Sequence, residues 1–409
     1  MPLRWARFPD RFSIIVLIIG MLLLVAELVN GRFWLNDFRV YYDAATALRQ
    51  DQPLYGVAHG LSSGFFKYAP VLALAYVPLS LLPYTVAAVI QYAIIVAAFI
   101  HAVLLVDRLV RTHVFPGRSP AFTPLFLLFA VVVVHLHREL HLGNINVLLV
   151  WLLVKGLDHL LSGRRSAAGI LIGIAILAKP HFAVLLPLLV LRGQHRAWTR
   201  ALGVVVLGLV APMLFLGISR TAELLVQWTG EMAKHNASLI YTGGSAYNNV
   251  DTLYSFLHRS MLHRFGLHGS NVEAGAVLCV VAILFGALVL THRARERQHG
   301  GSSCNLLKEY VLLMALVPSI TLTDTNHFLF SAPLILLIMQ HLLPMTSAIW
   351  VPLTAIPLLL GFGGNWGDAL GDWSDTLLHY GILGIANFGL VVLTVFLDQR
   401  SNPEATSVS

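Results

Sequence analysis

Apolar runs close to membrane-spanning length recur along almost the whole sequence, and they restrict its possible folds more than any other feature. The first run is Phe12–Val29, and others follow as far as Leu377–Leu397. A helix needs about 20 mainly apolar residues to cross the hydrocarbon core of a bilayer. The chain is 57% hydrophobic and only 11% charged, whereas soluble domains carry about 25% charged residues. The sequence therefore predicts an all-α polytopic membrane protein.

The N-terminal run, the cysteines and the charge argue against three other classes of protein. Phe12–Val29 is too long for the core of a signal peptide, and no A-x-A-like cleavage site follows it. Cys279 and Cys304 are far apart in the sequence and form neither a disulfide framework nor a metal motif. The basic residues behind the net charge of +7 lie in short connections, which indicates membrane orientation rather than nucleic-acid binding.

The basic residues also predict how the chain is oriented. Three arginines precede the first apolar run, so we expect a cytoplasmic N-terminus. Ala69–Leu82 is short and bounded by prolines, which is typical of a re-entrant or interfacial segment. If it does not cross, the basic clusters at Arg108–Arg118 and Arg192–Arg200 are cytoplasmic. The chain then has about 12 membrane helices in the inner (plasma) membrane, with both termini cytoplasmic.

After the first helix, the segments predicted to cross are Tyr84–Val106, Thr123–His135, Ile145–Leu161, Ala167–Ala178, Phe182–Leu191, Ala201–Gly217, Val272–Leu290, Leu306–Ile320, Phe328–Leu342, Ala348–Leu360 and Leu377–Leu397. We expect one membrane domain over 1–409, with a catalytic module at 1–217 and a variable module at 218–409. The outer loops of these modules are 31–83 and 221–271. This topology places the unusual polar stretches on the extracytoplasmic face, and such residues often mark a site.

Asp37 is the candidate for chemistry on that face. It directly follows the first apolar run and opens Phe38–Gln50, which has the pattern of an amphipathic interfacial helix. One interpretation is that its carboxylate caps this helix by accepting a backbone N–H. The other is that it acts as a general base and takes a proton from a hydroxyl. Asp43 and Asp51 are the rival carboxylates on the same segment.

An aromatic segment with one cation follows the amphipathic helix. Tyr41 lies on the apolar stripe of that helix, and Lys67 and Tyr68 lie in the run F-F-K-Y. These residues could form a groove for a lipid-linked substrate, with Lys67 near an anionic head group. They could equally be an interfacial aromatic belt with a snorkelling lysine.

The stretch His135–Asn146 is rich in polar groups for a turn between two predicted spans. Arg138 suits a phosphate group, and His141, Asn144 and Asn146 are further substrate-binding candidates. The alternative is a hydrated loop of ordinary polar residues. Two histidines four apart, His137 and His141, would be compatible with zinc, but the H-E-x-x-H pattern and a third ligand are missing, so we predict no metal site.

Four more polar features complete the candidate site. Lys179 interrupts an apolar stretch just before a proline, and it either binds an anion or snorkels to the surface. His327 is a second catalytic or phosphate-contacting candidate, unless its turn is only a helix start capped by Asp324. Asn249 lies among hydroxyls, amides and aromatics that would suit a sugar or an outer amphipathic helix. Gly361–Asp375 could contact an acceptor or be a solvated loop.

Several of these motifs occur together in one known family. D-F-R-V-Y-Y-D-A-A-T-A-L from Asp37, then F-K-Y-A-P-V-L-A-L, and later L-G-N-I-N and A-G-I-L-I-G-I-A-I-L-A-K-P resemble glycosyltransferase family 87 over roughly the first 200 residues. One departure is that Asn144 stands where this family often has glutamine. The resemblance implies a GT-C-type fold with interfacial helices on the extracytoplasmic face. It also implies a polyprenyl-phosphate sugar donor, typically mannose, and inverting transfer with Asp37 as base and no metal cofactor.

The main hypothesis is therefore a membrane mannosyltransferase that acts on a lipid-linked or surface glycan. The alternative is a transporter or flippase of lipid-linked sugars, for which inverted repeats and mid-membrane polar residues would be typical. The sequence shows no such repeat, and its polar residues gather on one predicted face. No Walker loop, dinucleotide fingerprint or nucleophile elbow occurs, so neither a nucleotide donor nor a covalent mechanism is indicated.

Overall fold

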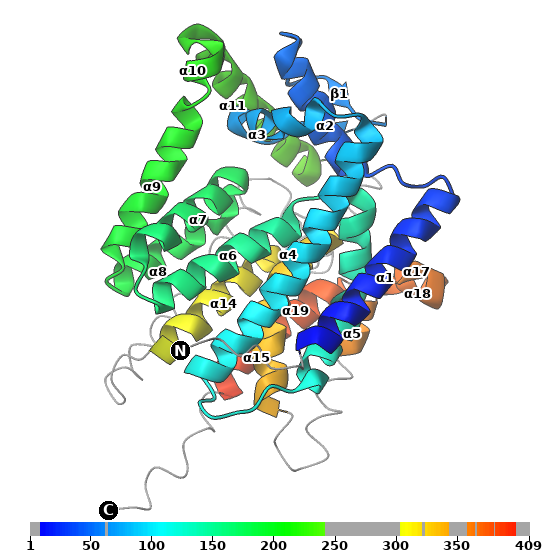
Figure 1. Ribbon diagram of the computed structural model, residues 1–409, viewed down its shortest axis with the longest axis vertical. Helices are drawn as coiled ribbons and strands as arrows, with labels where there is room; N and C mark the ends of the chain where they lie inside the picture. The colour runs from blue at the N-terminus through cyan, green and yellow to red at the C-terminus, as the bar shows by residue number, and fades with distance from the viewer. Residues whose placement is uncertain are drawn as a thin grey trace, which may run out of the picture. The chain divides into compact units, whose positions relative to one another are not determined.

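The structure is a computed structural model, and the part of the chain that it describes is almost entirely helical (Figure 1). The described residues are 9–61, 64–241, 303–320, 324–342, 358–364, 366–379 and 381–397. They fall into two compact units, Met1–Phe126 with His135–Ser238, and Leu127–Val134 with Leu239–Ser409. The helical content agrees with the predicted all-α fold, and the proposed division at residue 217 stays a prediction.

The first unit carries most of the described elements, although the middle of α5 (Leu127–Val134) and the last three residues of α11 belong to the second. In chain order the elements are α1 (Pro9–Val29), α2 (Asn36–Arg49), β1 (Ala58–His59), β2 (Gly64–Phe65), α3 (Pro70–Ser80), α4 (Tyr84–His113), α5 (Phe122–Leu142), α6 (Asn146–Leu161), α7 (Arg165–Ala178), η1 (Pro180–Val184), α8 (Leu185–Leu191), α9 (His195–Val210), α10 (Met213–Leu216) and α11 (Ile218–Tyr241). The two short strands pair antiparallel, with Ala58 opposite Phe65. The amphipathic helix α2 packs on α3 and buries Phe38, Tyr41 and Leu48.

Four helices in the described part of the chain are long and apolar enough to cross a membrane. They are Arg11–Val29, Tyr84–His113, Phe122–Leu142 and His195–Leu216. The first and last of these windows are only 17% and 11% buried, so they expose apolar side chains such as a membrane helix presents to lipid. These four helices among the described residues do not confirm the predicted total of about 12 spans. The segment at Ala69–Leu82 is, as predicted, too short for a span, because α3 has 11 residues.

Close approach of α7 and α9 depends on two glycines. A Cβ placed on Gly169 would lie 2.2 Å from the carbonyl oxygen of Ala197, and one on Gly173 would lie 2.7 Å from that of Ala201. Any side chain at these positions would push the helices apart. Small residues at such spacing are the usual way for apolar helices to pack backbone against backbone.

The helix α5 corrects the prediction that a span ends at His135 and a turn follows as far as Asn146. It continues through His135 and ends only at Leu142, where Gly143 takes a left-handed conformation with φ 67°. The expectation was wrong because His135 and Glu139 are both fully buried, on the same side of the helix as Leu136 and Leu140. Glu139 accepts hydrogen bonds in this position, so its polarity does not end the helix.

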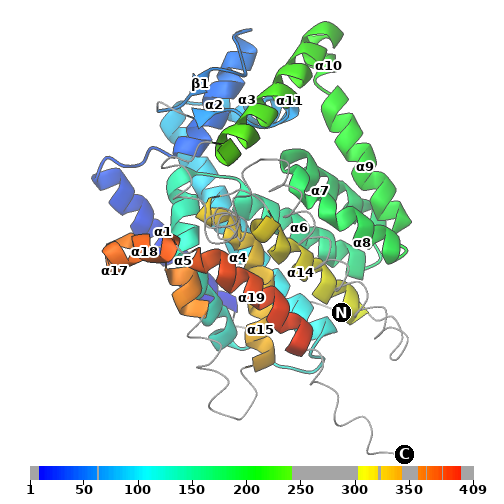
Figure 2. The same cartoon turned by 180° about the vertical axis from the view of Figure 1, so that it is seen from behind.

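The second unit contains α14 (Ser303–Ile320), η4 (Thr325–Ser331), α15 (Ala332–Leu342), α17 (Gly367–Leu370), α18 (Asp372–His379) and α19 (Ile382–Leu397). Figures 1 and 2 both show α14, α15 and α19 side by side, and α14 contacts each of the other two. Asn387 of α19 connects to α14, because its amide donates to the Ala315 carbonyl and to Ser319 Oγ, both at 2.8 Å. Ser331 of η4 donates to the Asn387 amide oxygen.

Three predicted loops or spans differ from what is observed. The predicted loop Gly361–Asp375 contains α17 and the start of α18, whose first turn holds Asp372 and Asp375 next to the positive end of the helix dipole. The predicted span Leu377–Leu397 is divided between α18 and α19, and Gly381 with φ 64° lies between them. The loop 221–271 begins as helix α11. Val272–Leu290 and most of Ala348–Leu360 lie outside the described residues.

Candidate active site

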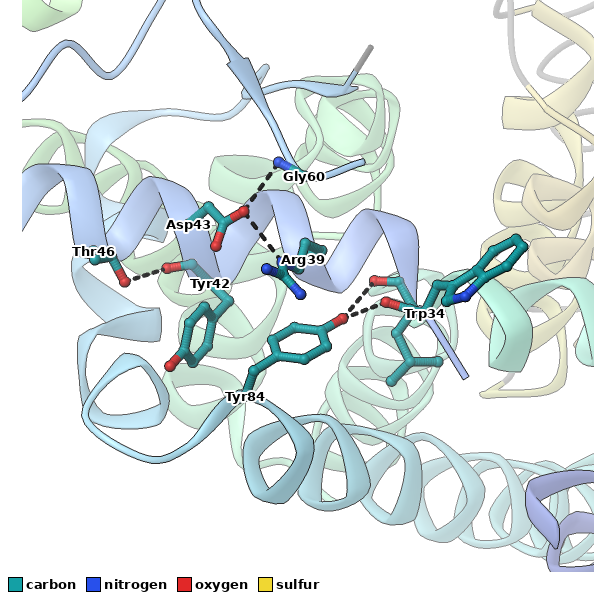
Figure 3. Close-up of polar contacts among 8 residues, drawn as sticks. Trp34, Arg39, Tyr42, Asp43, Thr46, Gly60 and Tyr84 are labelled. Carbon is teal, nitrogen blue, oxygen red and sulfur yellow. Dashed lines mark hydrogen bonds and ion pairs between the residues drawn. The ribbon is translucent and has the colours of Figure 1, made fainter. Parts of the chain in front are cut away.

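Asp37 lies in the first turn of α2 but does not cap it. The N-cap position is Leu35, a buried leucine in the left-handed region with φ 42°, and no side chain provides a cap hydrogen bond. Tyr84 Oη donates to the carbonyl oxygens of Trp34 and Leu35, which holds this sharp turn in place (Figure 3). A carboxylate in a first turn is stabilised by the helix dipole. Asp37 is therefore a first-turn residue of α2 and not its N-cap, as one interpretation of the sequence had it.

Asn144 orients the Asp37 carboxylate. Its Nδ2 donates to Asp37 Oδ2, and its Oδ1 accepts from Tyr41 Oη at 3.2 Å and from the Ile145 backbone N–H at 2.6 Å. Because two donors face one side of the Asn144 amide, the atom on that side must be the oxygen. The amide nitrogen therefore faces Asp37. Asn144 itself is 7% exposed. The contact joins residues 107 positions apart in sequence and connects α2 to the turn between α5 and α6.

Two tyrosines, the buried Tyr41 and the half-buried Tyr68, complete the network on this side. Tyr41 Oη and Tyr68 Oη are 3.0 Å apart, and the Tyr68 carbonyl accepts from Tyr55 Oη at 2.6 Å. Burial raises the pKa of both Tyr41 and Tyr68, and the negative charge of Asp37 adds to the effect. Both hydroxyls therefore keep their protons at neutral pH and act as hydrogen-bond donors.

Lys67 supplies positive charge near Asp37. Its carbonyl accepts from Trp228 Nε1 of α11 at 3.0 Å, which fixes the backbone of this segment. Partial burial of its ammonium lowers the pKa of Lys67, and the charge of Asp37 acts in the opposite direction. The side chain is exposed at the surface, so the cation is accessible to a ligand.

A second network holds the turn that carries Asn144. Lys179, just after α7, donates to Asn146 Oδ1 at 2.7 Å, and Asn146 Nδ2 donates to Glu139 Oε2 at 2.8 Å. Glu139 Oε1 accepts the Val147 backbone N–H at 3.0 Å, which satisfies a donor in the first turn of α6. The Gly143 carbonyl accepts from Gln91 Nε2 at 3.2 Å. The turn is therefore tied to α4, α5 and the end of α7.

Gly143 should not tolerate a side chain. Its φ of 67° costs an L-residue about 1–2 kcal/mol, and an added Cβ would lie 2.8 Å from Phe38 Cβ and 3.0 Å from Leu35 Cβ. We expect Gly143→Ala to lower the free energy of unfolding by about 2–4 kcal/mol, because strain and overpacking add. Gly163→Ala is the matched control, since its φ is 74° with nothing within 4 Å. Thermal unfolding in detergent measures both, and equal losses would contradict the packing argument.

The rival carboxylates have other roles. Asp43 Oδ2 accepts the Gly60 backbone N–H at 3.0 Å and lies 3.4 Å from Arg39 Nε, while the guanidinium of Arg39 stacks 4.3 Å from the ring centre of Tyr84 (Figure 3). Asp43 thus joins α2 to the strand connection. The side chain of Asp51 is 90% exposed and lies 3.6 Å from Arg220. Asp37 is the carboxylate of α2 that meets the asparagine and tyrosine network.

Two histidines of α5, His137 and His141, face Glu27 of α1. His141 Nδ1 is 3.1 Å from Glu27 Oε2 of α1, and His137 Nε2 is 3.9 Å from Glu27 Oε1. Glu139 is directed at Asn146 instead. Among the described residues, no group of three or more His, Cys, Asp or Glu side chains is placed to hold a metal ion. Arg138 is exposed on the same helix.

Two predicted residues remain, His327 and Asn249. His327 belongs to the second unit, where Asp324 caps η4 by accepting the Thr325 N–H at 2.7 Å, and His327 Nδ1 is 3.2 Å from the Asp324 carbonyl oxygen. The capped helix start considered for this turn is confirmed. Asn249 lies outside the described residues. The sequence reasoning missed Glu139 and Gln91, although Gln91 is a polar residue on an otherwise apolar face of α4, which is a usable signal.

Comparison with known proteins identifies the family of this chain. The sequence pattern of glycosyltransferase family 87 matches residues 65–319. The chain belongs to glycosyltransferase family 87. The matched residues include Asn144, Asn146 and Lys179, while α2 with Asp37 precedes them. Family membership and the apolar helices are together consistent with the expected membrane-embedded GT-C-type fold.

Two relatives show what this family 87 member is similar to. It is 26% identical to an alpha-(1->3)-arabinofuranosyltransferase of Corynebacterium glutamicum over 191 residues, 47% of the chain and 43% of that relative. It is 24% identical to a polyprenol-phosphate-mannose-dependent alpha-(1-2)-phosphatidylinositol pentamannoside mannosyltransferase of Mycobacterium tuberculosis over 327 residues, 79% of the chain and 70% of that relative. The match thus spans less than half of the first relative and more than two thirds of the second.

Proposed function

We propose that this family 87 enzyme transfers mannose from a polyprenyl-phosphate donor to a hydroxyl of a lipid-linked or surface glycan, with inversion and with Asp37 as general base. The observation that carries the proposal is the Asp37 carboxylate, which Asn144 orients beside Tyr41. The mycobacterial relative, named for its dependence on polyprenol-phosphate-mannose, supports the choice of donor. The positive-inside rule supports an extracytoplasmic site with both termini cytoplasmic.

The proposed step is a single displacement. The acceptor oxygen attacks the anomeric carbon while Asp37 takes the hydroxyl proton, and the bond from that carbon to the phosphate oxygen breaks. The electron pair of that bond leaves with the polyprenyl phosphate. Because the acceptor attacks from the face opposite the leaving phosphate, the configuration of the anomeric carbon is inverted. A base must lie within hydrogen-bond reach of the hydroxyl that it deprotonates. Asp37 is half-buried and can therefore be reached by an acceptor.

The leaving phosphate needs positive charge as the bond breaks. Lys67 is the accessible cation whose charge interacts with Asp37, so we assign the donor phosphate to it and require no metal ion. Tyr41, Tyr68 and Asn144 position the base in this scheme, and Asn146 and Lys179 hold the turn. Arg138, His141 and His327 remain proposed contacts to the donor or acceptor.

A transfer assay tests the proposal. Purified full-length protein is supplied with polyprenyl-phosphate-mannose or with a nucleotide-activated mannose, together with glycolipid acceptors, in the presence or absence of EDTA. We expect product from the polyprenyl donor alone, at a rate that EDTA does not change, with inverted anomeric configuration. Product from the nucleotide donor would refute the donor assignment. Movement of the donor across vesicles without product would favour the transporter instead.

A further inference from the structure

A polar pocket lies at the end of the α7–α9 pair that is remote from Lys179. It has a volume of about 350 Å³ and is lined by Ser166, Arg196, Thr199 and Arg200. Pockets that bind small ligands start at about 300 Å³. Ser166 is in the first turn of α7, whereas Lys179 follows its last residue, and 14 helical residues at 1.5 Å each separate the two ends by about 20 Å. The pocket is thus distinct from the candidate active site.

The packing of the two helices creates this pocket. On α7, Ser166 precedes Gly169 by three positions and Gly173 by seven, so all three share one face. The backbone of α9 approaches the two glycines closely, and a Cβ on Gly169 would come 2.8 Å from Arg200 Cβ. Arg196 and Arg200 are four residues apart and Thr199 lies between them, so both guanidinium groups lie on the side of α9 next to Ser166.

The electrostatic surroundings of the pocket favour an anion. The sequence contains no acidic residue between Asp158 and Glu223, so neither α7 nor α9 offers the arginines a carboxylate. All four lining residues are exposed. The pocket therefore combines two guanidinium forks with two hydroxyl donors, a set that matches the oxygens of a phosphate group. The positive-inside rule alone would explain the arginines, but not the hydroxyls and the hollow between them.

We propose that this pocket binds a phosphate group, and specifically the headgroup of an anionic phospholipid. It lies at the first residues of a helix that can cross the membrane, His195–Leu216, whose apolar window is only 11% buried. Headgroups are found at the depth of such helix ends, and basic pockets between membrane helices bind anionic lipids. The lipid would fix the α7–α9 pair from the end opposite the candidate active site. This inference does not depend on the proposed transferase activity.

Lipid binding to the purified full-length protein tests the inference. The protein is reconstituted in nanodiscs of phosphatidylcholine with or without phosphatidylglycerol, and retained lipid is measured by native mass spectrometry. We expect the double variant Arg196→Gln/Arg200→Gln to bind phosphatidylglycerol at least about tenfold more weakly, because two charge-assisted contacts are lost. Arg11→Gln, which removes an exposed arginine at the start of α1, should bind like the wild type.

A second variant and a second probe keep the test decisive. Ser166→Phe fills the pocket and leaves both arginines in place, so it should also weaken binding, and its unfolding temperature in phosphatidylcholine should match that of the wild type. Inorganic phosphate that displaces the lipid would support a phosphate site open to soluble ligands. Failure to displace it would support the lipid headgroup alone. Equal binding by wild type and both pocket variants would overturn the proposal.

Discussion

Asp37→Asn should reduce the transfer rate by about 10² to 10⁴-fold, because removing a general base typically costs that much. Asparagine has nearly the same shape as aspartate, and its amide oxygen can still accept from Asn144 Nδ2, which now donates to the carboxylate. The fold and the donor KM should therefore change little, and the loss should fall on kcat. Radiolabelled transfer from polyprenyl-phosphate-mannose, measured under saturating donor, gives this value.

Asp51→Asn is the matched control for this prediction. It removes a carboxylate just after the same helix, but its side chain is 90% exposed and lies 3.6 Å from Arg220 rather than beside Asn144. Its activity should stay close to that of the wild type. Asp37→Glu should recover part of the rate, since the carboxylate is kept but displaced by about 1 Å. An Asp37→Asn enzyme that keeps more than a tenth of the wild-type rate would remove Asp37 from the mechanism.

The pattern along the chain predicted the elements that depend on local sequence. The apolar stripe around Tyr41 predicted a helix at Phe38–Gln50, and the structure has one at Asn36–Arg49. Lys179 followed by Pro180 predicted a helix break, and α7 ends at Ala178 before a short 3-10 helix. In each case the residues that determine the structure lie within one or two helical turns of each other. The sequence pattern is therefore enough to predict it.

Contacts between residues far apart in the sequence could not be predicted in this way. Nothing local indicates that Asn144 donates to Asp37, or that the Gly60 N–H binds Asp43. The polar stretch after His135 was predicted to be a turn between two spans, since charged residues usually face water. Burial of Glu139 against the first turn of α6 reverses that expectation. Only tertiary packing decides whether such a residue is solvated or enclosed.

Glu139 and Lys179 should be coupled, because Asn146 joins them inside the protein. Glu139 is fully buried and Lys179 is 8% exposed, and both contact the Asn146 amide within 2.8 Å. Loss of one member of a buried charge pair leaves the other charge uncompensated, at a cost of about 3–5 kcal/mol. Glu139→Ala and Lys179→Ala should therefore each lower the free energy of unfolding by about that amount.

A variant that removes both Glu139 and Lys179 tests whether Lys179 stabilises the protein through Asn146 or binds the substrate. If the two charges compensate each other, Glu139→Ala/Lys179→Ala should lose less stability than the sum of the single variants, by about 0.5–3 kcal/mol in unfolding experiments. Lys155→Ala is the control: Lys155 lies 2.8 Å from Asp158, but Asp158 keeps Arg108 at 2.9 Å, so the loss should be about 1 kcal/mol or less. If Lys179 instead contacts the donor phosphate, Lys179→Ala will raise the donor KM and leave stability unchanged. That result would contradict the proposed coupling of Glu139 and Lys179 through Asn146. It would instead make Lys179 a substrate-binding residue, because an ammonium group that binds a ligand does not need a carboxylate inside the protein as its partner.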